Sequence, residues 1–177
     1  MPAMARSLLD DAFAHHVWAT LRVLDACAAL TPEQLEATAP GTYGSIIASL
    51  RHLVGADSGY LFRLSGGRFE RIDDEEEERM GLPELRAAME LNGSRWPQVL
   101  AEEIDPDELI LVRQDDGAEF GAPKGVRIAQ VPHHGTDHRS QVCTILTTLG
   151  IEPPGIDVWD YGDAAGKNVE RAAPAAE

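Results

Sequence analysis

The sequence predicts an all-α fold, an up-down four-helix bundle with a short β-hairpin before the last helix. Four long segments carry apolar residues at steps of three and four, which is the period of an amphipathic helix. Gly- and Pro-containing turns separate these segments, so each helix can end and the chain can reverse. Two short β-type runs flank Asp115-Asp116-Gly117, a pattern typical of a hairpin.

The first two long helices lie in the N-terminal third of the chain. We expect the first over Ala5–Leu30, where one apolar stripe recurs at helical spacing. Thr31-Pro32-Glu33-Gln34 has the form of a capping box and predicts a short helical turn. Ser45 can cap the second long helix, which should end near Leu64 because Ser65-Gly66-Gly67 follows.

The second half of the chain predicts two more long helices and the hairpin. The third helix is expected over Leu82–Ile104 and the fourth over Val126–Leu149, with hairpin strands at Leu109–Arg113 and Glu119–Phe120 between them. The run Asp73–Glu78 holds six consecutive carboxylates, whose repulsion favours a solvated loop.

Composition and charge limit the classes of partner. The 177 residues, 44% of them hydrophobic, suit one globular domain, placed at residues 1–163, with a flexible tail over 164–177. The net charge of −15 argues against nucleic acid and against an anionic membrane surface. No apolar run could span a bilayer, and the N-terminus lacks the apolar region of a signal peptide. Cys27 and Cys143 resemble small core residues of a cytoplasmic protein.

Histidines in the fourth helix carry the first chemical signal. His134 and His138 are four residues apart, which places both side chains on one helical face, about 5–6 Å apart at Cβ. Two such imidazoles can reach one transition metal. The same spacing also fits two unconnected surface histidines, so a third ligand has to be found.

The second helix offers that third ligand. His52 is the one large residue in a row of small ones, namely Ser45, Ala48, Ser49, Gly55, Ala56 and Gly59. Such a row can place His52 in a cavity, or it can serve close packing with another helix. A His52, His134 and His138 set would leave a coordination position open, which is typical of a catalytic metal site. Zinc suits three imidazoles, and nickel, iron and copper also accept them.

Three further side chains are candidates for supporting roles around these ligands. Gln141 shares the polar stripe of the fourth helix with His134 and His138, and Arg139 is adjacent to His138. His16 in the first helix could reach the bundle interior, or it could be a hydrogen-bonded core residue. Asp57 lies within an apolar stripe and points to a buried hydrogen bond rather than to metal ligation.

Several segments resemble the DinB family. They are the run His134–Gln141 with the following Leu149–Pro154, the upstream Leu50–Leu53 and His16–Ala19, and the closing Asp157–Tyr161. The resemblance covers about residues 6–162. It implies a four-helix bundle, often a homodimer, with a divalent metal held by His52, His134 and His138.

The wider superfamily implies a function as well. It includes transferases and isomerases that use a low-molecular-weight thiol such as mycothiol or bacillithiol, so a metal-dependent thiol S-transferase acting on a small molecule is the leading hypothesis. A metal-dependent hydrolase is a second hypothesis, although Gly135 stands where an HExxH motif has its Glu. A non-catalytic, stress-associated metal-binding protein is a third.

Overall fold

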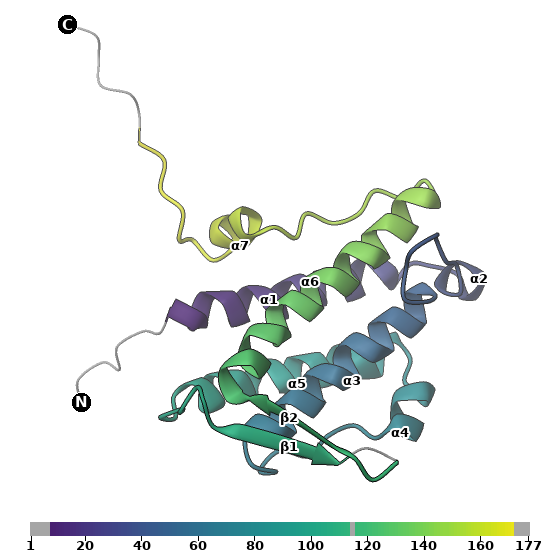
Figure 1. The fold of residues 1–177 in the computed structure, drawn as a ribbon. Helices are drawn as coiled ribbons and strands as arrows, with labels where there is room; N and C mark the ends of the chain where they lie inside the picture. The colour runs from purple at the N-terminus through teal and green to yellow at the C-terminus, as the bar shows by residue number, and fades with distance from the viewer. Residues whose placement is uncertain (1–7, 114–115, 172–177) are drawn as a thin grey trace, which may run out of the picture.

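A computed structural model of the chain describes residues 8–113 and 116–171 and is largely helical (Figure 1). In chain order the elements are α1 (Leu8–Cys27), α2 (Pro32–Leu35), α3 (Ile46–Leu64), α4 (Asp74–Arg79), α5 (Leu82–Leu100), β1 (Leu109–Arg113), β2 (Glu119–Pro123), α6 (Lys124–Thr148) and α7 (Val158–Ala164). The predicted mostly helical architecture, with a hairpin before the last long helix, is confirmed.

The four long helices pack side by side. Helix α1 lies against α5 and α6, and α3 lies against the same two helices (Figure 1). Contacts fix their directions: Arg86 of α5 meets Asp25 near the end of α1, whereas Trp96 of α5 meets Phe13 near its beginning, so these helices are antiparallel. Helices α3 and α5 run parallel, because the connection that holds α4 returns the chain along the molecule (Figure 1). The long helices therefore do not alternate in direction as the up-down order expected from the sequence would require.

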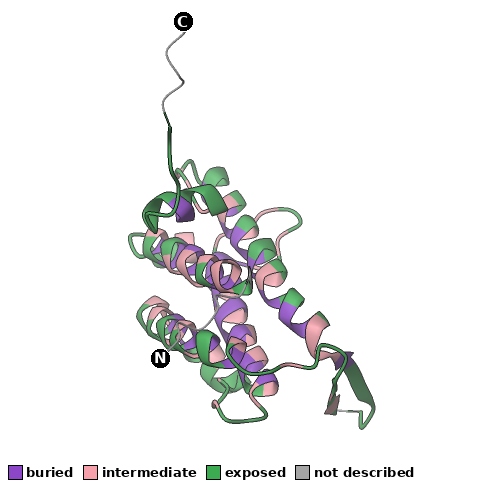
Figure 2. Ribbon diagram, turned by 90° about the vertical axis from the view of Figure 1, so that its left-hand side faces the viewer, coloured by how far each residue is buried: buried purple, intermediate pink, exposed green. Residues whose placement is uncertain are grey.

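Two apolar clusters and a polar layer form the interior. Side chains of α1, α3, α5 and α6 build both clusters, and the buried residues lie on the inward faces of these helices (Figure 2). Along α1, Phe13 belongs to one cluster and Val23 to the other. The buried polar residues His16 and Thr20 lie between them in sequence and in space. A polar layer therefore separates the two apolar clusters. His52, His134 and His138 lie at the height of this layer along the helices.

The hairpin leads directly into α6. Strands β1 and β2 pair antiparallel, with Leu109 opposite Pro123 and Arg113 opposite Glu119. The backbone N–H of Lys124 donates to the carbonyl of Glu108 at 2.9 Å, which fixes the start of α6 beside the sheet. Asp115 of the predicted turn lies outside the described residues.

The acidic run does not form the solvated loop expected from the sequence. Residues 74–79 are helix α4, with Asp73 as its N-cap and four acidic residues in its first turn. Carboxylates at that end of a helix interact favourably with its dipole, which offsets their mutual repulsion. The other five acidic residues are exposed, as the prediction of a solvated segment requires, whereas Glu77 is partly buried against α3.

Some helix bounds also differ from those expected. The first long helix ends at Cys27 rather than Leu30, the third ends at Leu100 rather than Ile104, and the last begins at Lys124 rather than Val126. Helix α7, capped by Asp157, was not predicted as a helix. Residues 5–7 of the first predicted helix and 172–177 of the predicted tail lie outside the described ranges, and the domain boundary at 163 stays a prediction.

Two observations bear on the thiols and on membranes. Cys27 is buried and Cys143 is partly buried, and neither forms a disulfide. Burial raises the pKa of the Cys27 thiol to about 12, which makes it a poor nucleophile. No helix within the described residues has the length and apolarity needed to cross a membrane.

Candidate metal centre

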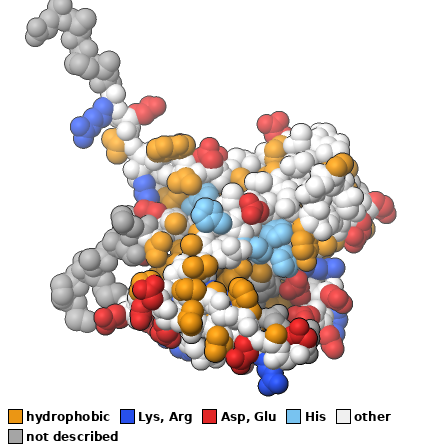
Figure 3. Space-filling view, viewed as in Figure 1, with side chains coloured by type: hydrophobic (Ala, Val, Ile, Leu, Met, Phe, Trp, Pro, Cys, Tyr) orange, Lys and Arg blue, Asp and Glu red, His pale blue; other side chains and the backbone are white. Residues whose placement is uncertain are grey.

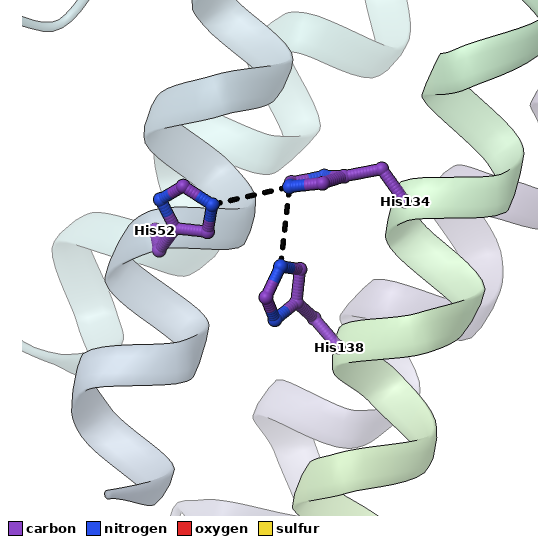
Figure 4. A group of neighbouring side chains, drawn as sticks. All are labelled: His52, His134 and His138. Carbon is purple, nitrogen blue, oxygen red and sulfur yellow. Dashed lines mark hydrogen bonds between the residues drawn. The ribbon is translucent and has the colours of Figure 1, made fainter. Parts of the chain in front are cut away.

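Three imidazole rings converge between the two helices that carry them, α3 and α6 (Figure 4). His52 projects from α3, and His134 and His138 project from α6. The Nε2 atom of His134 lies 3.1 Å from Nε2 of His52 and 3.1 Å from Nε2 of His138. One ligand atom from each of the three rings lies within 4.8 Å of the others. The structure thus brings together the three residues that sequence spacing singled out.

The chemistry of these nitrogens fits a metal ion. A neutral ring nitrogen carries either one N–H or one lone pair, so Nε2 of His134 cannot make both short contacts as good hydrogen bonds. A tetrahedral metal with bonds of about 2.0–2.1 Å separates its ligand nitrogens by about 3.3 Å, close to the spacing found here. The group could therefore hold a divalent metal ion.

Burial keeps the three rings neutral, which is the state that ligates metal. Burial, together with the neighbouring rings of His138 and His52, lowers the pKa of His134 to about 4. Burial also lowers the pKa of His52 and that of His138. Above pH 6.5 all three lone pairs are therefore available without proton release.

Tyr43 covers the group from the connection before α3. Its ring stacks on His52 with centroids 4.4 Å apart and meets His138 edge-on at 5.1 Å. The Oε1 atom of Gln141 accepts the backbone N–H of Tyr43 at 2.9 Å. Gln141 therefore acts on the site by holding Tyr43 in place. Burial lowers the pKa of His138, whereas a side-chain interaction with Gln141 raises it.

A buried polar network lies on the other side of α6. The guanidinium of Arg139 donates to Nδ1 of His16 at 3.0 Å and to Oγ1 of Thr20 at 3.1 Å. Because Nδ1 accepts, Nε2 of His16 carries the proton and donates to Asp57 at 3.0 Å. The indole N–H of Trp96 also donates to Asp57, at 3.2 Å to each oxygen. The expected buried hydrogen bond of Asp57 is present.

This network sets the position of α6, the helix that carries His134 and His138. Its members come from α1, α3, α5 and α6, so it ties all four long helices together at one level. Gly135 makes room for it, since a Cβ there would lie 2.4 Å from ring atoms of His16. His16 and Arg139 thus hold the face of α6 next to the one that carries the rings, and no hydrogen bond to the rings is found among the described residues.

A cleft of about 430 Å³ opens beside His52. The small residues Gly55, Ala56 and Gly59 of α3 form part of its lining, and Gly55 also permits close packing of Glu77 from α4. Helix α4 and the hairpin contribute further walls. Histidine side chains reach the molecular surface on this face of the protein (Figure 3).

Glu77 lines the same cleft, and the sequence did not single it out as a candidate site residue. A Cβ on Gly55 would lie 1.9 Å from Oε2 of Glu77, so the carboxylate rests directly on the α3 backbone one turn from His52. Burial raises the pKa of Glu77, and the charges of Asp74 and Glu78 raise it further. A carboxyl group with a raised pKa is a stronger proton acceptor than an ordinary Glu. Within a run of six acidic residues, no sequence signal separates it from its neighbours.

Comparison with known proteins identifies the family. The chain matches the DinB family profile over residues 4–172. This chain belongs to the DinB family. A crystal structure of a DinB-like protein from Bacillus cereus ATCC 10987 superposes with a TM-score of 0.59 and 18% sequence identity, covering 82% of this chain and 93% of that one. At that identity the likeness shows a shared fold. The search of curated proteins found no match.

Membership of the DinB family agrees with the site as built. The resemblance noted in the sequence spanned about residues 6–162, and the profile match covers that range. The three histidines of this DinB protein form the group that could hold a metal ion. Assignment of His52, His134 and His138 as ligands, and of the metal itself, remains to be tested on the protein.

Proposed function

We propose that this DinB protein is a metal-dependent enzyme of the thiol S-transferase class, acting on a small molecule with a thiol of the mycothiol or bacillithiol type. His52, His134 and His138 would hold the metal, with zinc or nickel as the first candidates and iron or copper as alternatives. A metal bound there would supply Lewis acidity, lowering the pKa of a thiol or water so that more nucleophile is present at neutral pH.

The observation that carries this proposal is the convergence of three ring nitrogens beside an open cleft. The three rings lie within ligand reach of one another, and His52 lines the cleft together with Gly55 and Gly59. A closed structural site would instead surround its metal with a fourth protein ligand, and none is found among the described residues.

The protein's own residues can serve the transfer in three ways. Tyr43 covers the rings of His52 and His138 and shields them from water. Glu77 can accept the proton released when a thiol S–H ionises, because burial raises the pKa of its carboxyl group and makes it a better base. The lining of the cleft can then orient the electrophile that the sulfur attacks, whose leaving group departs with the electron pair of the broken bond.

The test is a spectroscopic titration of the cobalt-substituted protein with mycothiol, bacillithiol and glutathione. Cobalt in a three-histidine site absorbs visible light, and a sulfur ligand adds a charge-transfer band in the near ultraviolet. We expect one of these thiols to produce that band in the parent protein and not in His134→Ala. An unchanged spectrum at millimolar concentrations of all three thiols would contradict the proposal.

Glu77 also favours a second candidate, a metal-dependent hydrolase. The sequence showed no general base next to His134, but the fold places the Glu77 carboxyl in the same cleft as His52. A base with a raised pKa can take a proton from water that attacks an ester or amide. Hydrolysis of a panel of such substrates, lost in Glu77→Gln but retained in Glu78→Gln, would favour this candidate over thiol transfer.

A further inference from the structure

Three arginines gather in the cleft beside the histidine group. Arg63 comes from the end of α3, Arg71 from the connection before α4, and Arg127 from the first turn of α6. The chain has 15 basic residues against 30 acidic ones, so three guanidinium groups in one cleft run against its overall charge. Arg63 and Arg71 also line an adjoining cavity of about 780 Å³.

Arg127 is buried with part of its hydrogen-bonding capacity unused. Only 8% of the residue is exposed. Its Nη2 donates to the carbonyl of Ile110 at 3.0 Å, while its Nε is buried and has no partner among the described residues. The guanidinium also lies 5.9 Å from the centre of the Phe120 ring. A buried cation normally pairs with an anion, because an uncompensated charge is costly to desolvate.

Arg63 is folded back along α3 towards the histidines. Its Nη1 donates to the carbonyl of Gly59 at 2.9 Å, and a Cβ on Gly59 would lie only 2.7 Å from that nitrogen. The glycine therefore permits this conformation. Burial lowers the pKa of Arg63, and repulsion from Arg127 and Arg71 lowers it further, so these charges act on one another.

No carboxylate of the described residues neutralises the three arginines. Asp74 and Glu77 line the same cleft, yet neither lies within 4.0 Å of a guanidinium nitrogen of Arg63, Arg71 or Arg127 among those residues. A role in holding the hairpin would account for the bond from Arg127 to Ile110. It would not account for Arg63 and Arg71, which come from other elements.

We infer that the arginine end of the cleft binds an anionic group, a carboxylate or a phosphate, carried by the substrate. His52 and Gly59 are seven residues apart, which is about 10 Å along a helix, and Arg63 reaches back to Gly59. The substrate class is thus a small molecule whose reacting atom and anionic group are about 10 Å apart. The inferred distance between reacting atom and anionic group rests on the proposed function, whereas anion binding by the arginines does not.

Calorimetric titration of the full-length protein with inorganic phosphate and, separately, with malonate tests this inference. We expect at least one anion to bind with one-to-one saturation at low ionic strength. Removal of a charged hydrogen-bond donor in Arg63→Gln or Arg71→Gln should weaken that binding at least tenfold. The comparison of phosphate with malonate shows which chemistry the arginines prefer. Arg68→Gln is the matched control, because Arg68 pairs with Glu102 on the surface outside this cleft.

The same titration in His134→Ala separates the arginine subsite from the metal. Retained anion binding in that variant supports the inference, even if no thiol ever perturbs the cobalt spectrum. Three results would overturn it. The first is the absence of saturable binding for both anions up to tens of millimolar. The second is an equal loss of affinity in Arg68→Gln and Arg63→Gln. The third is a loss of affinity in His134→Ala alone.

Discussion

His134 is both partly buried and a proposed metal ligand. Two ring nitrogens lie 3.1 Å from its Nε2, and burial holds its pKa at about 4 in the metal-free protein. A histidine in the unfolded chain takes up its proton near pH 6.5. His134 therefore binds a proton more weakly in the folded state than in the unfolded state.

This difference predicts the pH dependence of stability. Above pH 6.5 neither state holds the proton, and the full stability is present. As the pH falls from 6.5 towards 4, protons bind the unfolded state first, so the free energy of unfolding of the metal-free protein should decrease. Urea denaturation in a chelator at pH 7, 6 and 5 measures it. His134→Asn, which cannot titrate there, should show a smaller decrease, and an identical decrease would contradict the explanation.

Gly135 is the second residue with a specific steric role. We expect Gly135→Ala to destabilise the protein by about 1–3 kcal/mol, because the added Cβ overlaps buried atoms of His16 and Arg139 that have no free space to move into. Urea denaturation provides the measurement. Ser140→Ala, at an exposed position of the same helix, should change stability by less than about 0.5 kcal/mol. A Gly135→Ala variant as stable as the parent would contradict the packing described here.

At the scale of elements, one polar layer holds the four long helices in register. Asp57 of α3 accepts hydrogen bonds from His16 of α1 and Trp96 of α5, and His16 accepts one from Arg139 of α6. The two apolar clusters on either side can each tolerate small shifts. The directional bonds between them cannot, so this layer fixes the rotation of α6 that points His134 and His138 at α3.

Replacement of Asp57 tests the layer. In Asp57→Asn the amide nitrogen cannot accept a bond, and the buried charge of Arg139 loses its nearest compensation. We expect a loss of about 3–5 kcal/mol, the typical cost of breaking a buried charged network. Asp25→Asn is the control, because Asp25 pairs with Arg86 at the surface and should contribute about 1 kcal/mol or less. Similar losses of stability in thermal or urea unfolding of the two variants would show that the buried polar layer contributes no more than a surface ion pair.

Some features of the fold and the site could be predicted from the sequence and others could not, for physical reasons. Helical periodicity and caps are local, so the long helices, the hairpin and the i, i+4 histidines could be predicted. The row of small residues around His52 indicated either a cavity or close packing, and the structure has both, since Gly55, Ala56 and Gly59 line a cleft and Gly55 also packs closely against Glu77. The position of Glu77 depends on how α4 packs on α3, which no local pattern reveals. The same holds for the meeting of Arg63, Arg71 and Arg127.

On the scale of the whole molecule, charge and assembly remain predictions. The net charge of −15 predicts no binding of duplex DNA at physiological salt, despite the basic cleft. The resemblance to DinB proteins predicts a homodimer, and a groove of about 890 Å³ between α1 and α5 offers an apolar surface. Light scattering coupled to size-exclusion chromatography should give twice the chain mass of 19.2 kDa. A single species at the monomer mass would contradict the dimer.

The central claim is that three imidazoles from two helices hold one metal ion. Elemental analysis of the purified protein tests it most directly, with His52→Ala, His134→Ala and His138→Ala beside His133→Ala, an exposed histidine on the same helix as two of the proposed ligands. We predict about one divalent metal ion per chain in the parent and in His133→Ala, and a fraction of that in the other three variants. Equal metal content in all five proteins, or none in the parent after growth with zinc and nickel supplied, would contradict the claim.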